Sequence, residues 1–247
     1  MTDYYWDASV AGNASVGSNW SPSGPPGSAD KAIFTSANSV KDCTMNIASV
    51  GEIDIKNDYT GTITLANNFA INNTVNNLMQ GTTAAEFDCA GYDFTCSGAL
   101  TVGDGTAGMY FFPDTGSLTI GEAKASAKER VFHIDGARLY GVNPAQTGAN
   151  GNWDIYGEMK VENSGYVNLT EGVTTIKSYN EDGLAAGKDT VFVIDTIGGG
   201  AAPGILNFDL TTKNSDGNPY GIDIGGASGS NLSINQIKIR TSGGTFH

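Results

Sequence analysis

The chain has 247 residues, including 34 glycines, and its 26 acidic against 13 basic side chains give a formal net charge of −13. This charge argues against nucleic acid as a partner, because binding to a phosphate backbone requires a field of lysine and arginine. A hydrophobic content of 39% argues against disorder, and no apolar run approaches the roughly 20 residues of a membrane helix. We therefore expect a folded protein with no nucleic-acid partner and no membrane insertion.

The glycine content predicts an all-β fold. Charged residues make up 16% of the chain, against a usual share of about 25%. Glycine supplies positive φ angles at no steric cost, so this composition is typical of many short strands joined by tight turns.

Residues 1–34 combine two tryptophans with a proline-rich hinge. They begin MTDYYWDAS, which has neither the basic nor the apolar region of an export signal, so we expect the chain to be made in a cytoplasm. The stretch NWSPSGPPGSADKAIF (19–34) follows, in which Asp30 can accept hydrogen bonds from free backbone N–H groups in the turn before KAIF.

Residues 35–120 contain short apolar-polar-apolar triplets bounded by glycine or small polar residues. A triplet directs two side chains to one face of a strand and one to the other. Strands so short and so frequent favour a right-handed parallel β-solenoid, whereas a β-sandwich or jelly roll, the alternative fold, normally has strands of about five to six residues. Examples are IDI (53–55), ITL (63–65), FAI (69–71) and LTV (100–102).

Two similar stretches favour a repeat. SGALTVGDG (97–105) and TGSLTIGEA (115–123) share a central Leu-Thr-(Val/Ile)-Gly, and their separation is close to one coil of a parallel β-helix. We interpret them as equivalent positions in successive coils, where identical residues stack in apolar ladders.

The triplet rhythm breaks at residues 121–153, which we predict to be a lateral insertion or a joint between solenoid segments. The stretch EAKASAKER (122–130) has helix-forming residues and neither glycine nor proline, so it is compatible with a short surface helix or an insertion strand. Residues 154–247 return to triplets, including IKI (237–239), and are predicted to form further β-rich coils.

The three cysteines are predicted to be small buried hydrophobic residues, since a long chain with so few cysteines is a poor candidate for a disulfide framework. The sequence leaves open a bond between Cys89 and Cys96, which requires the two to lie on neighbouring strands.

Two parts of the chain carry a recognisable pattern, formed by Trp6, Asn19, Trp20, Pro26, Gly27, Asp30, Ala32 and Phe34 and then by the stretch FDCAGYDFTCSGALTVGDG (87–105). On these residues, about half of the chain resembles the repeat-rich β-helical proteins of bacteriophage virions and bacterial surfaces. That group often has Leu and Val where this chain has Cys89 and Cys96, which favours a core role for both. The resemblance implies a β-solenoid, and the missing export signal favours a virion protein over an exported adhesin.

A solenoid needs a cap, because its end exposes both the hydrophobic interior and unpaired strand edges. We predict that Trp6 and Trp20 cover that interior, with Pro26 stiffening the connection and Asp30 and Phe34 leading into the first coil. The alternative for the two tryptophans is an exposed pair that binds sugar.

The sequence predicts a non-enzymatic structural protein, a capsid decoration, cement or fibre protein on the surface of a phage virion. Its expected partners are the major capsid or other virion proteins and its own copies, as a trimer. The alternatives are an adhesin or glycan-binding module on a bacterial surface, which recognises a host-surface glycan, and a polysaccharide depolymerase. Aromatic residues are enriched in interface cores, so the expected contact residues are Tyr4, Tyr5, Tyr110, Phe111 and Tyr220.

No catalytic residue, cofactor or metal is predicted. A depolymerase of this fold would use a pair of carboxylates in a groove. The candidate aspartates mostly adjoin glycine or asparagine, where aspartate commonly serves as a turn former. They are Asp88, Asp93, Asp104, Asp114, Asp135 and Asp154.

Overall fold

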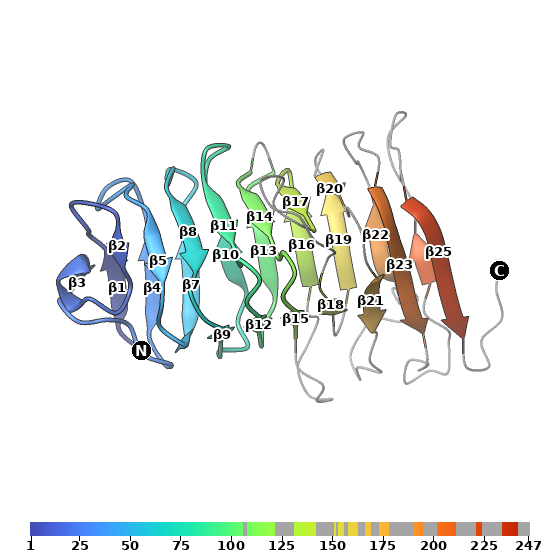
Figure 1. The fold of residues 1–247 in the computed structure, drawn as a ribbon, viewed down its shortest axis with the longest axis horizontal. Coiled ribbons are helices and arrows are strands. Elements are labelled where there is room, and N and C mark those ends of the chain that lie inside the picture. Colours follow the sequence, from blue (N-terminus) through green and yellow to red (C-terminus); the bar gives the residue numbers. More distant parts are fainter. Residues whose placement is uncertain are drawn as a thin grey trace.

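The chain forms a parallel β-solenoid in which successive turns stack along one axis (Figure 1). The computed structural model describes residues 1–105, 108–121, 131–141 and 151, and the strands at 153–155, 158–162, 166–168, 173–177, 190–194, 202–210, 221–223 and 234–241. Within these residues the only helical element is a single 3-10 turn, η1 (Gly17–Asn19). The predicted all-β solenoid is thus confirmed, and the sandwich alternative is wrong.

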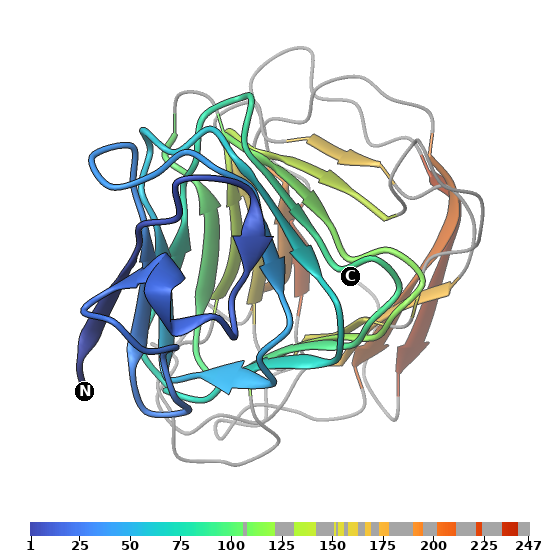
Figure 2. The ribbon, with the colours of Figure 1, turned by 60° about the vertical axis from the view of Figure 1, so that its left-hand side comes forward.

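Between Lys31 and Ile155, five successive turns each contribute one strand to each of three faces, and these turns enclose a common interior (Figure 2). The first face, sheet A, contains β1 (Asp3–Trp6), β3 (Trp20–Ser21), β4 (Lys31–Phe34), β7 (Glu52–Ile55), β10 (Asn77–Met79), β13 (Leu100–Gly103), β16 (Val131–Asp135), β19 (Glu158–Glu162), β22 (Thr190–Ile194) and β24 (Gly221–Asp223).

The second face, sheet B, contains β2 (Gly12–Asn13), β5 (Cys43–Met45), β8 (Thr62–Leu65), β11 (Glu86–Asp88), β14 (Tyr110–Phe112), β17 (Arg138–Tyr140) and β20 (Tyr166–Asn168). The third face, sheet C, contains β6 (Ser49–Val50), β9 (Phe69–Ile71), β12 (Phe94–Cys96), β15 (Leu118–Ile120) and β18 (Trp153–Ile155). Sheet D follows with β21 (Val173–Lys177), β23 (Ala202–Leu210) and β25 (Ile234–Thr241), and β21 lies next to β18.

The parallel register stacks like positions into columns that fill the interior. On sheet A one column runs through Phe34, Ile55, Met79, Val102 and Ile134, all of them fully buried. A column on sheet B runs through Cys43, Ile63, Phe87, Phe111 and Leu139, and a column on sheet C runs through Phe69, Phe94, Leu118 and Trp153. The triplets predicted these columns, because alternate residues of a strand face the same side.

The interpretation of the two similar stretches as successive coils is wrong. Leu118 of the second stretch pairs with Phe94, which precedes the first stretch, whereas Leu100 of the first stretch pairs with Asn77 and Phe132. The two stretches therefore form the sheet A side and the sheet C side of the same turn, on β13 and β15. Strands on all three faces have the same alternation of apolar and polar residues. Similarity between two stretches therefore does not show which face each of them forms.

Residues 121–153 include β16, β17 and the first residue of β18, and these strands continue sheets A, B and C in register. The stretch thus carries the stack onward, rather than serving only as a lateral insertion or joint. The predicted surface helix or insertion strand at 122–130 lies outside the described residues.

The predicted capping segment, 1–34, also contributes to the stack. Strand β1 pairs in parallel with β4, and β2 pairs in parallel with β5. The segment that departs from the parallel arrangement is β3, which pairs antiparallel with β1 and ends sheet A. The coils therefore begin before KAIF, earlier than the sequence predicted.

All three cysteines are free and buried, as predicted, and the open question of a Cys89–Cys96 bond is answered in the negative. Cys96 lies on β12 in sheet C, whereas Cys89 follows β11 in sheet B. Burial raises the pKa of the Cys89 thiol well above its usual value, which keeps it protonated and unreactive.

Glycine allows close contact between turns at the corner that precedes sheet C. A Cβ atom added to Gly116 would overlap the carbonyl oxygen of Tyr92 in the turn before it. A Cβ atom added to Gly151, at the same position of the next turn, would overlap the carbonyl oxygen of Gly116. Both obstacles are backbone atoms of the adjacent turn, so a side chain fits only if the turns move apart.

We therefore expect Gly116→Ala to destabilise the solenoid by about 1–3 kcal/mol, the usual cost of forcing extra atoms into a packed site. Urea unfolding followed by circular dichroism measures the change. Gly27→Ala is the control, because its added Cβ would meet only the Asp30 carboxylate, at 3.3 Å. Equal stability of the two variants would contradict the close contact at this corner.

Candidate functional site

Four buried aromatic rings pack together in the interior near the N-terminal end of the stack. The rings of Trp6 and Trp20 pack edge to face with centroids 5.1 Å apart, and Phe34 contacts both. Tyr59 packs on Phe34 from the next turn at 5.4 Å. We refer to Trp6, Trp20, Phe34 and Tyr59 as the N-terminal cluster.

The indole N–H groups of the N-terminal cluster are bonded inside the fold. The indole of Trp6 donates to the carbonyl oxygen of Lys41 at 2.8 Å, and that of Trp20 donates to the carbonyl oxygen of Ala14 at 2.7 Å. Trp6 is fully buried and Trp20 is only 3% exposed. The alternative of an exposed tryptophan pair that binds sugar is therefore wrong, because neither indole presents a face to solvent.

Asp30 lies at the turn before β4, near the buried residue Pro26 in the sequence. Its carboxylate accepts hydrogen bonds from the backbone N–H groups of Thr2, at 2.9 Å, and Gly27, at 3.1 Å. These two bonds, led by the one from Thr2, lower the pKa of Asp30 below its usual value. Asp30 thus joins the chain terminus to the turn that leads into β4.

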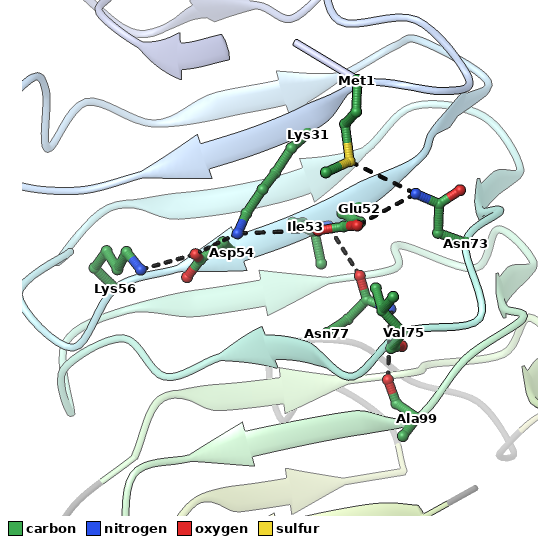
Figure 3. Close-up of polar contacts among 10 residues, drawn as sticks. All are labelled: Met1, Lys31, Glu52, Ile53, Asp54, Lys56, Asn73, Val75, Asn77 and Ala99. Carbon is green, nitrogen blue, oxygen red and sulfur yellow. Dashed lines mark hydrogen bonds and ion pairs between the residues drawn. The ribbon is translucent and has the colours of Figure 1, made fainter. Parts of the chain in front are cut away.

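An ion-pair network crosses the outer face of sheet A near the N-terminus (Figure 3). The Asp54 carboxylate lies between the ammonium groups of Lys31, at 2.9 Å, and Lys56, at 2.8 Å. Burial opposes the charge on Lys31, but the hydrogen bond and the charge of Asp54 outweigh it and raise the pKa of Lys31. The network joins β4 to β7, and Asn73 extends it by donating to Glu52 at 3.3 Å.

Asn77 is a polar residue inside the solenoid that the sequence analysis missed. Its side-chain oxygen accepts from the N–H of Ile53 at 3.0 Å, and its NH₂ group donates to the carbonyl oxygens of Val75, at 3.1 Å, and Ala99 (Figure 3). These bonds connect three successive turns. The signal in the sequence for this role is an asparagine at a strand position where the neighbouring turns have apolar residues.

Several of the candidate aspartates accept hydrogen bonds from residues in the turns. Asp93 accepts from the N–H of Ser117 at 2.9 Å and from the side chain of Asn68 at 3.2 Å, which joins three turns at one corner. Asp88 accepts from the N–H of Ala90 at 2.8 Å, as the turn-former interpretation predicted. Asp88 and Asp114 are both buried, in contrast to a catalytic pair that lines an open groove.

The outer face of sheet B carries an aromatic and arginine cluster on β14 and β17, formed by Tyr110, Phe112, Arg138 and Tyr140. The rings of Tyr110 and Phe112 are nearly parallel, with centroids 6.0 Å apart, and Tyr140 stacks on Tyr110 at 5.9 Å. The guanidinium of Arg138 lies 5.3 Å from the ring centroid of Tyr110 and donates to its hydroxyl at 2.7 Å. We refer to these four residues as the sheet B cluster.

Glu86 continues this column on β11, in register with Tyr110. Burial raises the pKa of its carboxyl, and the charges of Asp88 and Asp42 raise it further. The outer face therefore changes from carboxylates on β11 to aromatic rings on β14 and a cation on β17. A surface of this composition offers stacking, hydrogen bonds and charge in one place.

Among the predicted contact residues, Tyr110 is half-buried on the outer face and belongs to the sheet B cluster. Tyr4 and Tyr5 are half-buried on β1, and Tyr4 packs against the core. Phe111 is fully buried in the sheet B column, so its prediction as a contact residue is wrong. Its side chain alternates with those of Tyr110 and Phe112 and faces inward. Tyr220 lies outside the described residues.

No protein family, curated protein or solved structure matches the chain. In the described part of the chain, three or more histidine, cysteine, aspartate or glutamate side chains nowhere gather in a way that could hold a metal ion. The same residues include no helix of the length and apolar character needed to cross a membrane.

Proposed function

We propose that this protein is a non-catalytic structural component of a bacteriophage virion, a capsid decoration, cement or fibre protein that acts through protein–protein contacts. The observation that carries the proposal is the sheet B cluster, in which an exposed arginine and a half-buried tyrosine lie over stacked rings. Tyrosine and arginine are among the residue types most enriched at the energetic centres of protein interfaces. The sequence resemblance supplies the virion context.

The cluster is suited to this role because its geometry is fixed before a partner arrives. The hydrogen bond and ring contact between Arg138 and Tyr110 hold both side chains in place, and Phe112, 3% exposed, stacks against Tyr110. Side chains that are already ordered lose less entropy on binding. The three strands that carry the column belong to a stacked sheet, so the partner meets a firm surface.

The experiment is rebinding of the purified chain to phage particles from which it has been removed. Combined Tyr110→Ala and Arg138→Ala changes are expected to weaken binding at least about 30-fold, as for loss of an interface hot spot. Thr44→Ala, an exposed residue of β5 on the same face, is the control and should bind as the parent does. Unchanged binding of the double variant, with an unchanged circular dichroism spectrum, would contradict the role of the cluster.

The proposal includes a homo-oligomer, for which a trimer is expected. Light scattering on the purified chain measures this directly, as a particle mass of three chains. The major capsid protein or another virion protein is the proposed heterologous partner.

A further inference from the structure

Asp114 is a buried carboxylate that has neither a hydrogen-bond partner of good geometry nor an ion-pair partner among the described residues. Its side chain is fully buried, and neither of its oxygens accepts a hydrogen bond of good geometry from any described residue. It also forms no ion pair with the residues that the structure describes, in contrast to Asp54, which lies between two lysines. An ionised carboxylate in this condition is costly, so it calls for either a proton or a cation.

The position of Asp114 brings it near a second carboxylate. It lies in the turn after β14, directly above Ala90 in the turn after β11, and both residues have left-handed backbone, with φ of 61° and 50°. Asp88 ends β11 and is only 7% exposed. Asp114 comes two residues after Phe112, which is the register partner of Asp88 in the adjacent turn.

The charge of Asp88 acts on Asp114. Burial raises the pKa of Asp114 above its usual value, and the charge of Asp88 raises it further, against a smaller opposing effect of the Thr115 backbone N–H. One oxygen of Asp88 is engaged with the N–H of Ala90. Neither oxygen of Asp114 has a hydrogen-bond partner of good geometry among the described residues.

We propose that the stacked turns after β11 and β14 bind a calcium ion through the carboxylates of Asp114 and Asp88. Calcium fits because it takes oxygen ligands in irregular geometry, at about 2.3–2.6 Å, and accepts backbone carbonyls and water alongside carboxylates. A carboxylate pair without nitrogen or sulfur ligands disfavours zinc, copper and nickel. The ion would fasten two turns at the end of β14, the strand that carries Tyr110.

The test is thermal unfolding of the full chain after treatment with EDTA, followed by addition of calcium chloride. Calcium is expected to raise the Tm of the parent by about 3 °C or more, the effect of a ligand that binds only the native state. Asp114→Asn is expected to lose this response while remaining folded, because asparagine tolerates the left-handed backbone of this position. In EDTA the same variant should be as stable as the parent or more stable, since it removes an unpaired buried charge.

Asp7→Asn is the matched control, since it removes one exposed carboxylate at the N-terminal end and should keep the full response. Asp88→Asn should weaken calcium binding in a calorimetric titration. Addition of magnesium chloride at the same concentration measures how far charge screening alone changes the Tm. Lack of any calcium response in the parent, or an equal response in Asp114→Asn and Asp7→Asn, would overturn the proposal and leave Asp114 as a neutral buried acid.

Discussion

Replacing Phe111 with alanine is expected to destabilise the solenoid by about 3–5 kcal/mol, the range for removing a buried aromatic side chain. Phe111 is fully buried and packs edge to face on Phe87, at 5.8 Å, on Phe94, at 5.7 Å, and on Phe132, at 6.3 Å. These partners come from sheets A, B and C, so one ring joins all three faces. The surrounding strands are hydrogen-bonded to neighbouring strands on both sides. This limits how far they can move to fill the cavity that the alanine would leave.

Chemical denaturation measured by intrinsic fluorescence and by circular dichroism gives the change in unfolding free energy. Tyr92→Ala is the control, since that side chain is 39% exposed and its loss should cost little. An effect below about 1 kcal/mol for Phe111→Ala would show that the ring is not at the centre of the packed interior.

The second large effect is expected at Trp6. Its replacement with alanine should also destabilise by about 3–5 kcal/mol, because the indole is fully buried and contacts both Trp20 and Phe34. Trp6→Phe keeps a ring but loses the hydrogen bond to the carbonyl oxygen of Lys41, so a smaller loss of about 1–3 kcal/mol is expected.

The predicted cap role gives Trp6→Ala a further consequence that an ordinary core substitution lacks. Opening this end would expose the interior and the edge of sheet A, which would promote self-association. Hydrogen exchange should therefore rise first in β1 and β4, and light scattering should detect larger species. Val10→Ala, at a 68% exposed residue of the same end, provides the comparison. Uniform loss of protection along the described turns, with no self-association, would argue against a cap.

The fold was predictable because even a very short strand still shows its period of two. Triplets such as IDI (53–55) and FTC (94–96) lie on strands, and the first and third residues of each triplet face the interior. The face to which each strand belongs was less predictable. Turns vary in length, since the chain from Met159 to its partner Phe192 is much longer than that from Lys31 to its partner Glu52, so no single spacing marks a coil.

The candidate sites were harder to predict because they form between turns. Tyr110 and Arg138 are far apart in the chain and become neighbours only through the parallel register. The same holds for Asp88 and Asp114, which match no calcium-binding motif along the sequence. The bond from Gly27 to Asp30 was predictable, since it lies within one turn, whereas the bond from Thr2 depends on the pairing of β1 with β4.

Quantitative mass spectrometry of purified phage particles from the genome that encodes this chain tests the proposed function most directly. The chain should be present at a fixed copy number per particle, and the Tyr110→Ala and Arg138→Ala double variant should be depleted while Thr44→Ala is retained. Particles that lack the chain altogether would contradict the proposal.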